Sequence, residues 1–243
     1  MLTWLKKLIN NSESYTEVEA TTLIKNYEDE QRLAGFGYKV NWYMIPEYEL
    51  IAKDWSIQDI ADAIGLKKQS LMPWNEGVGF GYKHRFDNEK QIYISSPFEG
   101  WVYLINSTES ELNLLNDIVE NYYAFGSYRV VDYVAWKQVK DNKAIRHFAY
   151  ADGEVLANIG VQTEEEYILD FINLSELNEE QAIESMIEDK NANDESIVTI
   201  FDEDHVIEMC IKWTDKDPSR FDEQVVPLYE MPKMGIAGYL IKA

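Results

Sequence analysis

Histidine is the first residue type to examine for catalytic or metal chemistry, and the chain has three: His84, His147 and His205. None forms an H-x-x-x-H pair, the usual way for one helix to supply two zinc ligands. The nearest approach to a metal site is the run DEDHVIE, in which His205 and Glu208 would share a helix face and could bind a divalent cation. Acidic capping of a helix N-terminus explains the same run. We favour capping, and we predict no metal site and no cofactor.

No nucleophile in the sequence has the surroundings that activate one. The chain has no G-x-S-x-G elbow around any serine. Cys210 falls on the apolar stripe of a predicted helix, so we interpret it as a small buried side chain. Carboxylates are too abundant to single out a catalytic pair. The sequence therefore predicts a protein that is not an enzyme.

The stretch WNEGVGFGYKHRF has three glycines at alternate positions. It lacks the G-x-G-x-x-G spacing and the GK[ST] ending of phosphate-binding loops. We predict a strand or wide loop whose glycines allow close backbone approach. An alternative function uses residues 74–84: a ligand-binding or enzymatic domain in which His84, Arg129 or Arg146 converge on a pocket. Otherwise we expect the two arginines to pair with Asp132 or other nearby acids.

The strongest signal in the composition is negative charge, with a formal net charge of −22. Between Asp152 and Glu223 the chain has 22 acidic and four basic side chains, whereas the rest is close to balanced. Such a field repels nucleic-acid phosphates and attracts basic proteins. We therefore predict a basic protein partner and no nucleic-acid binding, with solubility alone as the alternative. The partner would bind the acids at two predicted helix starts, which are Glu164, Glu165, Glu166, Asp202, Glu203 and Asp204.

Hydrophobic patterning predicts the first elements of the chain. Residues 17–31 have the pattern of a helix, and residues 38–45 and 48–53 have the pattern of two strands separated at Pro46. Further on, IYISSP and GWVYLI are predicted strands joined by a Pro-Phe-Glu-Gly turn.

Two capping boxes predict helix starts. Ser56 is followed three residues later by Asp59, and the apolar stripe after it ends at Gly65, a good C-terminal stop. Thr108 is followed by Glu111, which predicts a helix that runs to Tyr122 with apolar residues on one face.

Residues 122–160 alternate aromatic and β-branched residues, and Asp141-Asn142 and Asp152-Gly153 interrupt the pattern. The pattern is typical of an antiparallel three-strand meander with tight turns. Its first strand would place Tyr128, Val130, Asp132, Val134 and Trp136 on one face, and Val131, Tyr133 and Ala135 on the other. Both faces are apolar, so we expect both to be covered.

The acidic portion, residues 152–223, is predicted to be helical, with helices that begin at Thr163, Asn178 and Asp202. The tail GIAGYLIKA is a predicted final strand. Together the elements predict an α/β fold of the α+β type: a largely antiparallel sheet with helices packed against it, in a single compact domain over residues 1–243.

The cysteine content and the absence of targeting signals predict a cytoplasmic protein. One cysteine allows no internal disulfide, which fits a reducing compartment. Lys6 and Lys7 interrupt any apolar stretch near the first residue, and no run approaches the roughly 18 apolar residues of a membrane span. We interpret the many aromatic residues as core side chains rather than as an exposed groove.

Several segments together resemble bacterial proteins associated with contact-dependent toxin–immunity loci. The segments are YELIAKDWSIQDIADAIG, GWVYLI, FGSYRVVDYVAWKQVKDNKAIRHFAYADGEVLANIGVQTEEE and KWTDKDPSRFDE. The resemblance extends from about Tyr48 to Glu223 and includes no catalytic motif. It implies a stand-alone cytoplasmic immunity protein that neutralises a cognate antibacterial toxin by direct binding.

Overall fold

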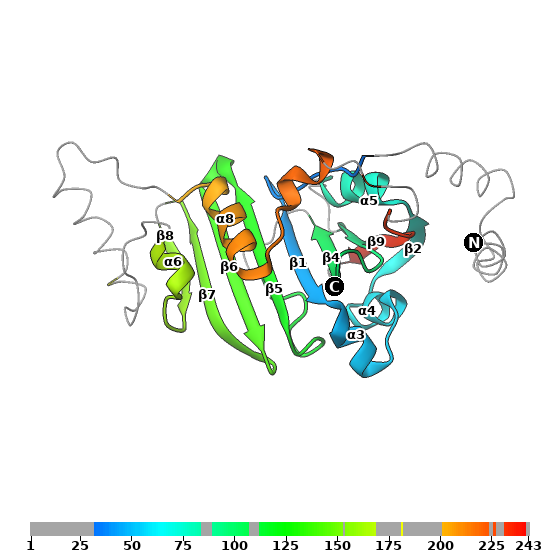
Figure 1. Ribbon diagram of the computed structural model, residues 1–243, viewed down its shortest axis with the longest axis horizontal. Helices are drawn as coiled ribbons and strands as arrows, with labels where there is room; N and C mark the ends of the chain where they lie inside the picture. The colour runs from blue at the N-terminus through cyan, green and yellow to red at the C-terminus, as the bar shows by residue number, and fades with distance from the viewer. Residues whose placement is uncertain are drawn as a thin grey trace, which may run out of the picture.

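A computed structural model gives the fold of the chain (Figure 1). It describes residues 32–83, 89–106, 112–152, 154–168, 181, 201–223, 226 and 231–241. The predicted helices at residues 17–31 and after Asn178 lie outside the described residues, except for Gln181. Within the described residues, no helix is both long enough and apolar enough to cross a lipid bilayer.

The described strands form one nine-stranded antiparallel sheet, which confirms the predicted α+β class and exceeds the predicted size. Across the sheet the order is β2-β9-β3-β4-β1-β5-β6-β7-β8. The strands are β1 (Asn41–Pro46), β2 (Lys67–Met72), β3 (Glu89–Ile94), β4 (Trp101–Asn106), β5 (Tyr122–Tyr128), β6 (Tyr133–Lys140), β7 (Lys143–Ala151), β8 (Glu154–Ile159) and β9 (Gly235–Ile241).

The helices and 3₁₀ turns lie between these strands in the chain. They are α3 (Glu47–Lys53), α4 (Ile57–Ala63), α5 (Trp74–Gly81), α6 (Glu164–Ile168), α8 (Glu203–Thr214) and the 3₁₀ turns at Arg129–Val131 and Pro218–Glu223. Figure 1 shows β8 and α6 at one end of the sheet and β2 at the other, with α8 lying across β5 and β6.

Both faces of the sheet are covered, as the two-sided apolar pattern predicted. Strand β1 lies in the middle of the sheet and all six of its residues are buried. Trp42 points into a core with α5 and α8, whereas its neighbour Tyr43 points into a second core with α3, α4 and residues 112–119. The first core holds many of the aromatic rings, including Trp74, which confirms their interpretation as core side chains.

The predicted meander exists, but it begins with one more hairpin than expected. A 3₁₀ turn at Arg129–Val131, followed by Asp132 at φ 47°, divides the predicted first strand into β5 and β6. The meander therefore has four strands, β5 to β8, and the exposed Val130 does not share a sheet face with Trp136. The turn at Asp141-Asn142 is where the sequence places it, with both residues at positive φ.

Three local predictions were wrong. The first is the strand at residues 48–53, which is helix α3: acids in its first turn and Lys53 in its last favour the helix. The second is the helix from Thr108 to Tyr122: its start lies outside the described residues, but residues 112–121 form turns and irregular backbone, and Tyr122 begins β5. These turns are bound to the sheet by the buried Lys137, whose Nζ donates to the Leu112 carbonyl oxygen (3.0 Å).

The third wrong prediction is the glycine-rich strand or loop, which forms α5. Its buried residues Trp74, Gly77, Val78 and Gly81 follow a helical spacing of three and four. A Cβ atom at Gly77 would overlap the Tyr93 ring, so glycine is what lets α5 lie close against the sheet.

Candidate functional site

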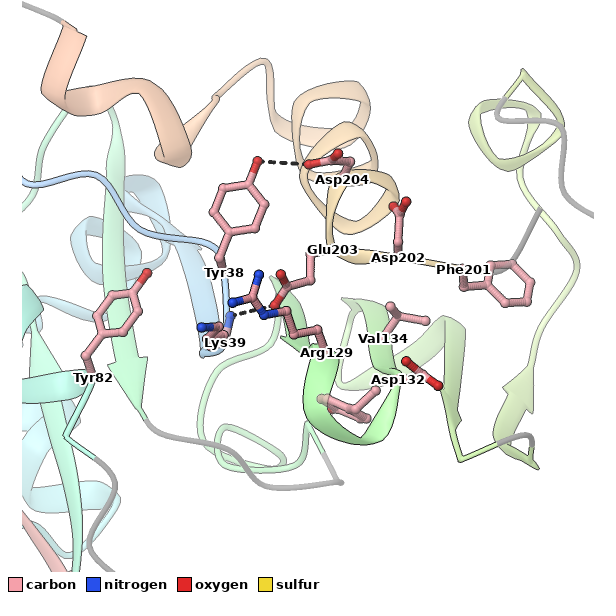
Figure 2. A pocket seen from close by; sticks show the side chains of 11 residues that line it. Tyr38, Lys39, Tyr82, Arg129, Asp132, Val134, Phe201, Asp202, Glu203 and Asp204 are labelled. Carbon is pink, nitrogen blue, oxygen red and sulfur yellow. Dashed lines mark hydrogen bonds between the residues drawn. The ribbon is translucent and has the colours of Figure 1, made fainter. Parts of the chain in front are cut away.

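A pocket of about 730 Å³ opens where the N-terminal end of α8 faces the 3₁₀ turn before β6 (Figure 2). Four separate parts of the chain meet here: the segment before β1, the end of α5, the β5–β6 connection and the start of α8. The lining residues are Tyr38, Lys39, Tyr82, Arg129, Asp132, Tyr133, Val134, Phe201, Asp202, Glu203 and Asp204.

Asp202 caps the helix that forms one wall of the pocket. Its Oδ1 accepts a hydrogen bond from the His205 backbone amide (3.1 Å), and His205 Nδ1 accepts one from the Asp202 amide (3.1 Å). The predicted helix start at Asp202 is therefore confirmed. The contact of His205 with the Asp202 amide is the reciprocal half of this capping box. Among the described residues, no three His, Cys, Asp or Glu side chains gather as metal ligands.

The next two acids bind the segment before β1. Glu203 Oε1 accepts from the Lys39 backbone amide (3.1 Å) and lies 3.4 Å from Ser127 Oγ. Asp204 Oδ1 accepts from the Tyr38 hydroxyl (3.0 Å), as the dashed line in Figure 2 shows. Partial burial and the Asp204 carboxylate both raise the pKa of the Tyr38 phenol, which keeps it a donor at neutral pH.

Each of these three carboxylates is held through one oxygen and presents the other. No described residue donates a hydrogen bond to Oδ2 of Asp202, Oε2 of Glu203 or Oδ2 of Asp204. An oxygen fixed in this way needs little further ordering to accept a cationic donor.

The remaining lining residues make the pocket mixed in charge but net acidic. Asp132 adds a fourth carboxylate, while Lys39 and Arg129 are its two cations. Arg129 and Asp132 are both exposed, and neither takes part in an ion pair with another described residue. The expected pairing of Arg129 with Asp132 is therefore not formed, although both side chains lie at the same pocket.

Tyrosine and phenylalanine side chains also line the pocket. Tyr82 Oη accepts a hydrogen bond from the Gly37 amide (3.2 Å), and burial raises the pKa of this phenol to about 12. Tyr133 and Phe201 are buried. Aromatic faces next to carboxylates suit an organic cation, such as a lysine or arginine side chain.

The acids of α6 lie apart from this pocket. Glu166 is about 1% exposed and its carboxylate binds the Arg146 guanidinium, the Trp136 indole N–H (2.8 Å) and the Thr163 amide (2.7 Å). It is therefore a structural anion, unavailable to a partner. Glu164 is exposed and Glu165 is half-buried. The structure thus brings only Asp202, Glu203 and Asp204 of the six predicted partner-binding residues into the pocket.

The alternative site at residues 74–84 does not form as a binding loop. The segment is mostly helix α5, packed on the sheet, and only Tyr82 of its described residues lines the pocket. Of the three residues expected to converge there, Arg129 lines the pocket, His84 lies outside the described residues, and Arg146 is occupied by Glu166.

Cys210 is fully buried, and burial raises the pKa of its thiol to about 12. Its interpretation as a small buried side chain is confirmed, because a thiol of this pKa is not a nucleophile at neutral pH.

Tyr38, Lys39, Tyr82 and Asp132 were not predicted to share a site with α8. Asp132 carried one usable signal, since Asp is enriched at left-handed turn positions. The others are brought together only by the strand order, which places β1 in the middle of the sheet.

Comparison with known proteins identifies no relative: no protein-family model, no curated protein and no solved structure matches the chain.

Proposed function

We propose that the protein is a cytoplasmic immunity protein, which binds a basic antibacterial toxin domain and blocks it by direct contact. The observation that carries the proposal is the row Asp202–Asp204 along an open, aromatic-backed pocket, with one oxygen of each carboxylate left to accept a partner's cation. That the basic partner is a toxin is an expectation from the resemblance to bacterial toxin–immunity proteins.

The distribution of charge supports a protein partner over a small molecule. Among the 22 acids between Asp152 and Glu223, exposed ones such as Glu154, Glu164 and Glu208 lie outside the pocket. Their field would act on a basic surface larger than one side chain and accelerate its encounter. Within the pocket, a lysine or arginine of the partner would lie between Asp132 and Asp204, against the ring of Tyr38.

The proposal is tested with the protein encoded by the neighbouring gene, which we expect to be the toxin, and two charge-neutralised variants. Asp132→Asn/Asp204→Asn removes two charges at the pocket and keeps an acceptor for Tyr38. Asp222→Asn/Glu223→Gln is the matched control, because both residues are exposed and outside the pocket. We expect the pocket variant to weaken binding by about 10-fold and the control by less than about 2-fold, since charges that contact the partner contribute more to affinity than charges outside the contact.

Salt provides the second arm of the test. Affinity for the toxin should fall as ionic strength rises, and fall less steeply for the pocket variant. Equal affinities for both variants, or an affinity that is independent of salt, would overturn the electrostatic binding site.

A further inference from the structure

The two edges of the sheet are built differently. At the β2 edge, Lys67 and Lys68 are exposed, Lys68 adopts φ 51°, and the register with β9 shifts between Lys67 and Ser70. Exposed lysines and irregular backbone are common means of preventing another strand from pairing with an edge. The β2 edge is therefore protected.

The β8 edge is much less protected. Its sequence EVLANI has no lysine and no proline, and its one charged residue, Glu154, is the first of the strand. Leu156 (41% exposed), Ile159 (50%) and Val161 (64%) present apolar surface along it. A register shift leaves Leu156 as an extra residue, after which pairing with β7 is regular through Ile159. In the described part of the chain, no strand pairs with the outer side of β8.

This edge is also held rigidly. Arg146 Nη1 donates to Asn158 Oδ1 (2.8 Å) and to the Ile159 carbonyl oxygen (3.1 Å), while the rest of the guanidinium is fixed by Glu166. A backbone that is already ordered loses little entropy when another strand pairs with it.

The charge around the edge selects the kind of strand that fits. Between Asp152 and Ile168 the chain has five acidic side chains and no basic one, and four remain once Glu166, which is paired with Arg146, is set aside. Glu154 and Glu164 are exposed. A second copy of this chain would bring the same negative charge to the contact, whereas a strand with alternating basic and apolar residues complements both the carboxylates and the apolar side chains.

We propose that the β8 edge binds an extended, lysine- or arginine-rich segment of the partner, which adds to the sheet as a further antiparallel or parallel strand. The inference rests on the proposed function in one respect, that the partner is a basic protein. Main-chain hydrogen bonds would supply affinity, and contacts with Leu156, Ile159 and Val161 would supply selectivity. The site is separate from the pocket at α8, because none of these residues lines it.

The test uses the full-length, ¹⁵N-labelled protein and a short end-capped peptide of alternating lysine and valine. We expect the peptide to shift the amide resonances of residues 154–161 and to leave those of the pocket unchanged. A peptide N-methylated at alternate backbone amides should bind about 10-fold more weakly, because it has lost the ladder donors. A peptide with glutamate for lysine should not bind. Equal binding of the N-methylated peptide, or shifts confined to the pocket, would overturn the inference.

Variants separate the edge from the pocket. Leu156→Lys/Ile159→Lys introduces like charge at the edge and should weaken peptide binding by about 10-fold or more. Ile51→Lys is the control, since Ile51 is 73% exposed on α3, away from both sites. If this control or the pocket variant Asp132→Asn/Asp204→Asn weakens peptide binding equally, the edge is not the site. The two proposals can fail separately. If the peptide binds at β8 but the pocket variant binds the toxin as well as the natural protein does, the β8 inference stands and the pocket is not the toxin-binding site.

Two other occupants of the edge are tested on the free protein. Light scattering that shows a dimer, which the Leu156→Lys/Ile159→Lys variant dissociates, would assign the edge to a second copy of the chain. Slow hydrogen exchange of the outward-facing β8 amides without peptide would assign it to a segment of the same chain. Either result would overturn the proposal.

Discussion

Arg146 and Glu166 form a buried bidentate ion pair, although 20 positions separate them in the chain. Arg146 Nε lies 2.9 Å from each carboxylate oxygen of Glu166, and Nη2 lies 2.8 Å from Oε1. Both side chains are about 1% exposed. The pair joins β7 to α6, and through Asn158 it also fixes the end of β8. One interaction therefore positions the start of the acidic portion on the sheet.

Removal of one charge from this pair should be strongly destabilising. Glu166→Gln leaves the Arg146 cation buried without its counter-ion, and we expect the free energy of unfolding to fall by about 3–5 kcal/mol. Glu165→Gln, one residue away and partly exposed, should change it by less than about 0.5 kcal/mol. Urea denaturation followed by tryptophan fluorescence measures both. Similar stabilities for the two variants would show that the buried pair is not a determinant of the fold.

His147 should make stability depend on pH in the acidic range. It is 7% exposed, its Nε2 has no hydrogen-bond partner among the described residues, and burial with the nearby Lys137 and Arg146 cations lowers its pKa to about 4. The unfolded chain, with a pKa of about 6.5, binds a proton that the folded chain excludes. The contribution of His147 to the free energy of unfolding is therefore fully present above about pH 6.5. It is lost as the pH falls toward about 4, by about 3 kcal/mol in total.

The check compares unfolding of the natural protein and His147→Gln between pH 7 and pH 4.5. Carboxylates titrate mainly in the lower part of this range and contribute to both curves, so the difference between the curves isolates the imidazole. The variant should lose less stability over the range. Parallel curves would mean that His147 is protonated in the folded protein as readily as in the unfolded chain.

Asp202 allows helix capping and partner binding to be separated. Asp202→Ala removes the cap of α8 and should reduce the free energy of unfolding by about 1 kcal/mol. Asp202→Asn keeps an equally good cap but removes the charge, so its stability should change little while its affinity for the basic partner falls. Thermal unfolding and toxin-binding titrations of the two variants test this together. An Asn variant with unchanged toxin affinity would assign Asp202 to capping alone.

Elements that depend on neighbouring residues were predicted correctly, whereas the elements that were missed depend on contacts between distant parts of the chain. The capping box at Ser56 and Asp59 and the turn at Asp141-Asn142 formed where the sequence indicated, because each depends only on neighbouring residues. The helix expected after Thr108 is absent from residues 112–121, where Lys137 of β6 donates to the Leu112 carbonyl oxygen and to the side-chain oxygens of Asn113 and Asn116. Thr108 itself lies outside the described residues.

The pocket was predictable only in part. The row Asp202–Asp204 could be found from its charge and its place before an apolar helix. Its opposite wall requires the sheet order, because the pairing of β1 with β5 is what brings Tyr38 and Arg129 to the same pocket. No local pattern encodes that pairing, so Lys39 and the pocket's tyrosines were not foreseen, and Arg129 was expected only at the alternative site.

Helix α5 permits a prediction with an internal control, because two of its glycines differ in their surroundings. A Cβ atom at Gly77 would overlap the Tyr93 ring, whereas one at Gly79 would meet nothing within 4 Å. Alanine has the higher helix propensity, so Gly79→Ala should raise the free energy of unfolding by about 0.5–1 kcal/mol. Gly77→Ala gains the same propensity but forces α5 away from the sheet, and overpacking of this kind costs about 1–3 kcal/mol.

Thermal unfolding of the two alanine variants should therefore move in opposite directions, with a higher midpoint for Gly79→Ala and a lower one for Gly77→Ala. The second variant also has a structural readout, because the Tyr93 ring contacts Trp74 edge to face and any displacement of α5 would alter tryptophan fluorescence. Equal stabilisation of both variants would show that close packing of α5 against the sheet does not require glycine at position 77.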